Sequence, residues 1–239
     1  MKSHRIWMIW MIWIACMAAC PFCLESATWK KHLIAEGGHC NTALAFDVNE
    51  DALPDVIASY AGKVSLFLAP TWEKEVVLHR FQQPGAGCIH STSLDVDGDG
   101  DMDLLMASDF ETSQVMLNKG DGTFIKITDR NVIIDQNGMG AAVGDYDNDG
   151  DMDWFVTSIM QPPDLFGNRL YRNMGSGTFE DATDEAGVAN GGWGWAACFA
   201  DFDNDRYLDV FHVNGWRAGD PDGGTENGDQ VRFFHSRGD

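Results

Sequence analysis

Short apolar runs recur along the chain at nearly equal intervals, and an Asp-rich segment stands immediately before each of them. The runs lie at 56–58, 104–106, 154–156 and 210–213. Continuous apolar runs of this length favour strands that are buried on both faces. Small residues precede each Asp-rich segment, at position 43 and at 91–93, 140–142 and 196–197. This pattern is expected where the first strands of neighbouring sheets crowd together around an axis.

Two further strands are predicted after each of the first three apolar runs, separated by turns rich in Gly and Asn. We expect them at 64–68 and 75–80, at 114–117 and 124–127, and at 169–171 and near Phe179. No helix is expected after the N-terminal segment. Four strands per repeat predict an all-β fold of antiparallel β-propeller blades, of which about four are present.

The Asp-rich segments are four nine-residue repeats that align without gaps, each at the turn between the first and second strands of a blade. We call them loop one (47–55), loop two (95–103), loop three (145–153) and loop four (201–209). Their starts are 48, 50 and 56 residues apart. This spacing suits one four-stranded blade per repeat.

The loops carry oxygen donors in a spacing that is typical of calcium sites. Positions one, three, five and nine supply side chains, and position seven supplies its backbone carbonyl. The predicted ligands are Asp47, Asn49, Asp51, Leu53 and Asp55; Asp95, Asp97, Asp99, Asp101 and Asp103; Asp145, Asp147, Asp149, Asp151 and Asp153; and Asp201, Asp203, Asp205, Tyr207 and Asp209. Up to four calcium ions are therefore expected.

The residue at position six decides which loops are expected to bind calcium most tightly, because the chain is expected to turn there through positive φ. Loops two and three have Gly100 and Gly150, whereas loops one and four have Ala52 and Arg206. A side chain in the left-handed region costs about 1–2 kcal/mol. We therefore expect loops one and four to bind calcium more weakly.

The chain is strongly acidic, with 37 Asp and Glu residues against 16 Lys and Arg and a formal charge of −21. This charge argues against nucleic acid as a partner. The loops hold 18 of the 37 carboxylates. Crowded carboxylates repel one another when no metal is present, so calcium is expected to couple to folding.

EF-hands are excluded by the residues that follow the loops. An EF-hand needs a bidentate Glu at position twelve and flanking helices. That position holds Ala58, Met106, Val156 and His212, all within strand-like runs.

The N-terminal segment reads as an export leader. Lys2, His4 and Arg5 precede an apolar run at 6–19, which is short for a membrane span. We predict a leader over 1–27 and propeller blades over 28–239. A cleaved signal peptide, lipidation at Cys20 and an uncleaved anchor stay open. Each alternative predicts an exported protein, secreted or bound to the cell envelope, that meets a membrane only through the leader.

Three cysteines follow the leader, Cys40, Cys88 and Cys198. Cys40 and Cys88 each stand seven residues before a loop, so they occupy equivalent positions in neighbouring repeats. A disulfide between them stays open, and buried free thiols are favoured.

Several motifs give the chain a family resemblance. The loops together with LNKGDGTF at 117–124 resemble an FG-GAP or VCBS repeat, the repeat of integrin α-subunit propellers. GWGWAACFADFDND at 192–205, with NRLYRN at 168–173 and FEDAT at 179–183, is similar to the cartilage acidic protein (ASPIC/UnbV) family. The resemblance covers about 29–239. It implies part of a seven-bladed ring, calcium binding, an extracellular location, and adhesion through protein or glycan partners whose identity it does not give.

The fourth repeat reaches its third strand at 231–234, and the chain stops at Asp239. Residues 236–239 align with 173–176, where the third repeat continues to a fourth strand. A truncated propeller is therefore expected, and a closed four-bladed ring is the alternative.

Other residues are weaker candidates for ligand contacts. His39, His90, Trp193 and Trp195 fall near the starts of first strands, at one end of the predicted channel. Trp216, Arg217 and the segment 219–228 form an insertion-like loop. Residues 237–239 spell Arg-Gly-Asp, but they occupy the recurring turn, so adhesion through this tripeptide is not favoured.

No nucleophile–base motif stands out, and we expect a non-enzymatic protein. The alternatives are a calcium-dependent lectin or a carbohydrate lyase, which would need a base such as His90 or Tyr171. Fold analogy alone does not decide between them.

Overall fold

The computed structural model describes residues 30–160, 166–214 and 231–237. Residues 36–239 form one compact unit, distinct from the unit that ends at Ala35. The predicted leader over 1–27, Trp216, Arg217, the segment 219–228 and the end of the 237–239 tripeptide lie outside the described residues. No helix in the described ranges is both long and apolar enough to cross a membrane.

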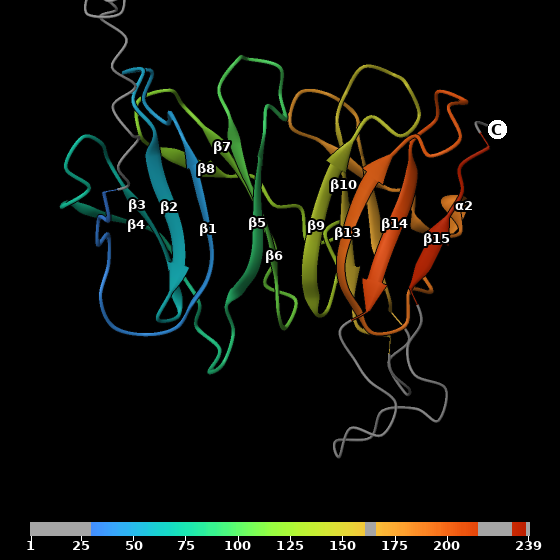
Figure 1. Ribbon diagram of the computed structural model, residues 1–239, viewed down its shortest axis with the longest axis horizontal. Helices are drawn as coiled ribbons and strands as arrows, with labels where there is room; N and C mark the ends of the chain where they lie inside the picture. The colour runs from blue at the N-terminus through green and yellow to red at the C-terminus, as the bar shows by residue number, and fades with distance from the viewer. Residues whose placement is uncertain (1–29, 161–165, 215–230, 238–239) are drawn as a thin grey trace, which may run out of the picture. The chain divides into compact units, whose positions relative to one another are not determined.

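The described chain folds into four antiparallel sheets that follow one another in sequence order (Figure 1). The first sheet contains β1 (Cys40–Phe46), β2 (Asp55–Tyr60), β3 (Lys63–Phe67) and β4 (Glu75–Arg80). The second contains β5 (Cys88–Leu94), β6 (Asp103–Ser108), β7 (Gln114–Asn118) and β8 (Phe124–Lys126). The third contains β9 (Gly138–Gly144), β10 (Asp153–Ser158), β11 (Arg169–Asn173) and β12 (Phe179–Asp181). The fourth has β13 (Gly194–Ala200), β14 (Asp209–Asn214) and β15 (Arg232–Phe234) within the described residues.

Each sheet pairs its strands in simple chain order, which is the up-and-down pattern of a propeller blade. We number the four sheets as blades one to four. The prediction of an all-β fold with propeller blades is confirmed, and the predicted strands lie within one or two residues of the observed ones.

The first strands of the blades, β1, β5, β9 and β13, lie side by side (Figure 1). Small residues make this approach feasible. A Cβ atom added at Gly140 would lie only 2.6 Å from the carbonyl oxygen of Trp195 in the next first strand. Between β1 and β5, the hydroxyl oxygens of Thr42 and Ser91 are 3.0 Å apart. The small residues before each loop thus lie at the interface between blades.

Three hydrophobic cores lie between successive blades, and the second strand of a blade contributes to the cores on both of its faces. In β6, Leu104 and Met106 join the core toward blade one, whereas Leu105 joins the core toward blade three. In β10, Trp154 faces blade two and Phe155 faces blade four. This double burial explains why the apolar runs are continuous rather than alternating.

One short helix contradicts the expectation of no helix beyond the leader. Helix α2 (Thr183–Ala186) forms a single turn after β12 and ends at Gly187, whose φ is 68°. The Thr183 hydroxyl oxygen accepts a hydrogen bond from the Leu170 backbone N–H at 2.9 Å. One turn is too short to give a helical hydrophobic period, although the acidic first turn and the terminal Gly were available signals.

Cys40, Cys88 and Cys198 are free thiols, as expected, but only Cys88 is buried. Cys40 and Cys198 are exposed, so the expectation of buried thiols is wrong for these two. Cys40 and Cys88 begin the adjacent strands β1 and β5, so their predicted equivalence is confirmed, but they do not form a disulfide. Burial raises the pKa of the Cys88 thiol to about 12, which keeps it protonated and unreactive at neutral pH.

Candidate metal centres

All four Asp-rich loops connect the first strand of a blade to its second strand. The ninth residue of each loop opens the second strand: Asp55, Asp103, Asp153 and Asp209. The loops therefore occupy the same place in each blade, as the sequence repeat predicts.

A shared hydrogen-bond frame folds each loop around its first carboxylate. In loop three, Asp145 accepts hydrogen bonds from the backbone N–H groups of Asp149 at 3.0 Å and Gly150 at 3.2 Å. The fifth carboxylate then accepts the N–H of position seven, at 2.8–2.9 Å in all four loops. These bonds hold the side chains of positions one and five inside the turn.

The ninth carboxylate of each loop is completely buried and joins two parts of the blade. In loop three, one oxygen of Asp153 accepts the N–H of Tyr146 at 3.0 Å, and the other accepts the N–H of Asn173 at 2.8 Å. Asp55, Asp103 and Asp209 make the same pair of bonds. The sequence suggested only a metal ligand here, but the structure adds a role in tying the loop to the end of the third strand.

The backbone of every loop enters the left-handed region twice. At position six, φ is 66° for Ala52, 99° for both Gly100 and Gly150, and 81° for Arg206, as the sequence predicts. Position four also has positive φ, which sequence reasoning missed; it holds Glu50, Gly98, Asn148 and Asn204. Asn tolerates this region better than most residues, so it was the available signal.

Several of the predicted ligands lie close enough together to share one ion. One carboxylate oxygen from each of three residues lies within 4.8 Å of the others in loop two (Asp95, Asp97 and Asp99), in loop three (Asp145, Asp147 and Asp153) and in loop four (Asp201, Asp203 and Asp205). Loop one forms no such group of three acidic or histidine side chains, because its third position is Asn49. The expectation that loop one binds calcium therefore rests on its sequence pattern alone.

Loop three contains an oxygen with no protein partner. Asp147 Oδ1 is buried and accepts no hydrogen bond within the described chain. An unpaired buried carboxylate oxygen is costly, and a bound cation would satisfy it. The donor set consists of hard oxygens, which suits calcium. The residues of loop three therefore fit the ion that the sequence implies.

Burial, helped by neighbouring carboxylates, disfavours the charged forms of several carboxylates in loops two and three. Burial raises the pKa of Asp103 to about 6 and that of Asp153 to about 7. The pKa values of Asp97 and Asp147 are also raised, first by burial and then by the neighbouring carboxylates. A divalent ion would reverse this effect, because it favours the ionised form.

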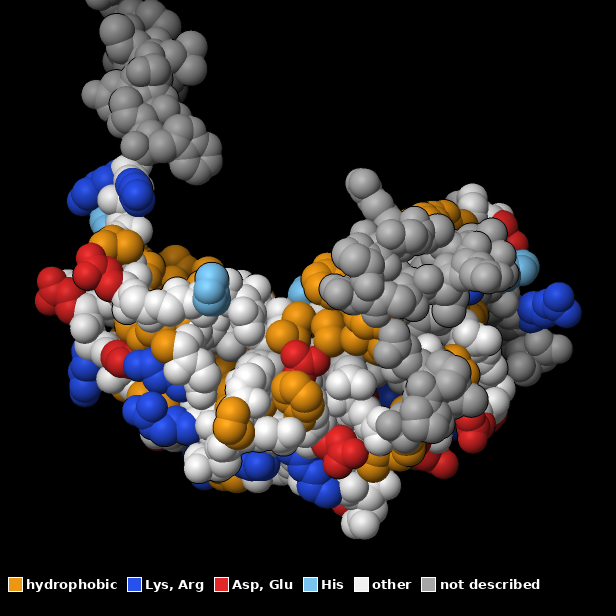
Figure 2. All heavy atoms as spheres, turned by 90° about the horizontal axis from the view of Figure 1, so that it is seen from below, with side chains coloured by type: hydrophobic (Ala, Val, Ile, Leu, Met, Phe, Trp, Pro, Cys, Tyr) orange, Lys and Arg blue, Asp and Glu red, His pale blue; other side chains and the backbone are white. Residues whose placement is uncertain are grey.

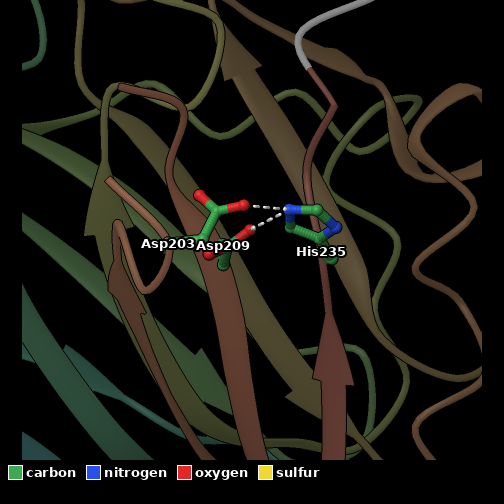
Figure 3. Close-up of side chains that lie close together, drawn as sticks. All are labelled: Asp203, Asp209 and His235. Atoms are coloured by element: carbon green, nitrogen blue, oxygen red, sulfur yellow. Dashed lines mark hydrogen bonds and ion pairs between the residues drawn. The ribbon is translucent and has the colours of Figure 1, made fainter. Parts of the chain in front are cut away.

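A second small cluster extends loop four toward the third strand of its blade. His235 Nε2 lies 2.9 Å from Asp203 Oδ2 and 3.9 Å from Asp209 Oδ1 (Figure 3). Sequence reasoning missed His235, because it lies 26 residues after the loop ends at Asp209 and no motif connects the two.

Loop three has a basic side chain, Arg172, at the place that corresponds to His235. The Arg172 Nε atom lies 3.1 Å from Asp147 Oδ2, and it donates a hydrogen bond to the Tyr146 hydroxyl at 2.9 Å. Arg172 immediately precedes Asn173 at the end of β11, as Leu117 precedes Asn118 at the end of β7. Loops two and three thus differ in local charge although their ligand sets are the same.

We predict that Arg172→Leu strengthens calcium binding at loop three by about 3–10-fold, because it removes a positive charge beside the ion. Leucine already occupies the equivalent place beside loop two. Arg80→Leu, at the exposed end of β4, is the matched control. Calorimetric titration with calcium measures the change. Equal calcium affinities for Arg172→Leu and the unchanged protein would show that the guanidinium charge does not weaken calcium binding at loop three.

Two asparagines couple loops one and two to the next blade. The Asn118 side-chain amide donates to the Val48 carbonyl at 3.0 Å, and Asn173 donates to the Val96 carbonyl at 3.1 Å. Val48 and Val96 are the second residues of loops one and two. The loops are therefore part of the interface between blades, so ordering one loop also supports its neighbour.

The other residues that the sequence suggested for ligand contacts or catalysis differ in their exposure to solvent. His39 and His90 are exposed and Trp195 is 52% exposed, near the starts of the first strands as expected. Tyr171 is completely buried, and its hydroxyl donates to Asp135 Oδ1 at 3.1 Å. Burial raises its pKa well above the ordinary value, so the structure contradicts Tyr171 as a base.

The surface outside the loops is mixed in character. On the face shown in Figure 2, acidic side chains lie in small separate groups among basic and hydrophobic ones. A groove of about 390 Å³ opens between blades three and four. Its lining combines rings with charged groups: Tyr146, Phe199, Tyr207, Phe234, Arg172 and Glu185.

Comparison with known proteins identifies the repeats. The FG-GAP-like repeat family matches residues 95–156 and 164–212. No curated protein matches the chain. Among solved structures, an Agrocybe aegerita lectin described as recognising non-reducing terminal N-acetylglucosamine is similar at 18% identity, with a TM-score of 0.44. The match covers 72% of this chain, which spans 46% of the lectin chain. The segments 95–156 and 164–212 are thus similar to FG-GAP-like repeats, and they lie on propeller blades.

Proposed function

We propose that the protein is an exported, non-enzymatic scaffold whose Asp-rich loops bind calcium and whose surface binds an extracellular protein or glycan. FG-GAP-like repeats on propeller blades support a binding or adhesion role. The apolar, positively flanked N-terminus supports export, and the motifs at 168–173, 179–183 and 192–205 support a relationship to the cartilage acidic protein family.

The observation that carries the calcium proposal is loop three. Three of its carboxylates approach one another, and Asp147 Oδ1 is buried without a partner. The same backbone hydrogen bonds recur in the other loops, so we infer that each loop can hold an ion in the same way. In this proposal calcium has a structural role: it fixes the turn between the first and second strands and, through Asn118 and Asn173, the neighbouring blade.

Calorimetric titration of the full chain with calcium tests the proposal. We expect up to four ions, with tighter binding at loops two and three than at loops one and four. Asp147→Asn should weaken binding at one site, whereas Glu73→Gln, an exposed carboxylate outside the loops, should leave the isotherm unchanged. Absence of calcium binding, or equal effects of the two variants, would overturn the proposal.

The groove between blades three and four favours a calcium-dependent lectin as the second candidate. Aromatic rings beside charged groups are a common lining for small polar ligands. Glycan-array binding that requires calcium and is lost in Tyr146→Ala would support this candidate. Turnover of a polyuronide would instead indicate a lyase, with exposed His90 as the remaining predicted base.

A further inference from the structure

We propose that loop four, together with His235, forms a site that binds a first-row transition metal such as Zn²⁺ in preference to calcium. The ligands are Asp203, Asp209 and His235 (Figure 3). This inference goes beyond the calcium scaffold, and it does not require calcium in the other loops.

The distances are compatible with direct coordination. His235 Nε2 is 2.9 Å from Asp203 Oδ2 and 3.9 Å from Asp209 Oδ1, and all three atoms lie within 4.8 Å of one another. Ligands about 2.0–2.1 Å from a tetrahedral Zn²⁺ are separated from each other by about 3.3–3.4 Å. Small side-chain movements would therefore place the three atoms around one ion.

The donor chemistry separates this cluster from the other loops. An imidazole nitrogen with two carboxylates suits zinc and its neighbours, whereas calcium takes oxygen ligands. The other three blades have no histidine at this place: Leu68, Leu117 and Arg172 stand there. A histidine at this place is therefore confined to blade four, whose loop has Arg206 in the left-handed position six.

The surroundings hold the ligands and leave room for the ion. Phe233 stacks on the His235 ring, with centroids 6.1 Å apart and an interplanar angle of 13°. Asp209 Oδ1 accepts the Ser236 N–H at 2.9 Å, and this oxygen keeps a second lone pair. The side chains of His235 and Asp203 are 42% and 49% exposed, so water can enter and complete the coordination shell.

The test is zinc titration of the full chain by calorimetry with calcium in excess. Thiolates are also zinc ligands, so the comparison is between variants that share the same cysteines. Leucine stands at the equivalent place in blades one and two, which makes His235→Leu a conservative change. Asp203→Asn removes a ligand and keeps the imidazole. His39→Leu, an exposed histidine outside the cluster, is the matched control.

We expect His235→Leu and Asp203→Asn to weaken one zinc site by at least about 10-fold, since loss of even an outer partner has an effect of this size. In protein labelled with ¹⁵N-histidine, zinc should shift the Nε2 resonance of one ring, and His235→Leu should abolish that signal.

Identical zinc isotherms for His235→Leu, His39→Leu and the unchanged protein, with no shifted resonance, would overturn the inference and leave a simple hydrogen bond between His235 and Asp203. Calcium binding at loops two and three should be unaffected by His235→Leu. The two proposals can therefore fail separately: calcium binding can be absent while the zinc site is present, and the zinc site can be absent while calcium binds.

Discussion

Replacing Asp153 by alanine is expected to lower the free energy of unfolding by about 2–6 kcal/mol, even when no calcium is present. The Asp153 carboxylate is completely buried and accepts the backbone N–H groups of Tyr146 and Asn173. The variant leaves both donors without an acceptor, and each buried unsatisfied group costs about 1–3 kcal/mol. Urea unfolding in chelator measures the loss.

Asp151→Ala in the same loop is the matched control, because Asp151 is exposed and its predicted ligand is the backbone carbonyl. Its stability in chelator should stay within about 0.5 kcal/mol of the unchanged protein. If Asp153→Ala were destabilised only in the presence of calcium, the carboxylate would act through the ion alone, and the double role assigned to position nine would be wrong.

Replacing Trp154 by alanine is expected to cost about 3–5 kcal/mol of stability. Trp154 is completely buried in the core between blades two and three, and its ring centroid lies 5.4 Å from that of Tyr171. The cavity left behind is bounded by strands of both blades, so little can collapse into it. Denaturant unfolding, with the slope checked for two-state behaviour, measures the change.

Trp195→Ala provides the contrast, because Trp195 is 52% exposed in β13. We expect it to cost much less than Trp154→Ala. Equal losses for the two variants would contradict the view that the second strands are buried between blades and carry most of the packing energy.

The fold could be predicted closely because its signals are local and repeated. An Asp-rich turn, a continuous apolar run and small residues before the turn each have one physical cause, and their recurrence in register defined the blades. Helix α2 was missed, since one helical turn has no period to detect. The positive φ at position four of the loops was missed as well: Asn148 and Asn204 were available signals, but Glu50 at the same position gives no sign of a left-handed backbone.

The candidate site was predictable only where its residues are close in sequence. The loop carboxylates lie within nine residues, so their spacing carries the chemistry. Arg172, His235, Asn118 and Asn173 reach the loops from the ends of third strands or from the next blade. Strand pairing brings them there, and no sequence spacing encodes it. The burial of Tyr171, which was named only as one base that the alternative lyase could use, is a tertiary property that sequence spacing does not show.

Thermal melting of the full chain, with calcium and with a chelator, tests the central claim that calcium in the loops stabilises the blades. Each tight site saturated at 100 times its Kd adds about 2.7 kcal/mol. In a domain of this size, each 1 kcal/mol shifts Tm by about 2–4 °C. Two tight sites therefore predict that the chelator lowers Tm by more than about 10 °C and that added calcium restores it. An unchanged Tm would contradict the account and leave the loops as acidic turns held by their own hydrogen bonds.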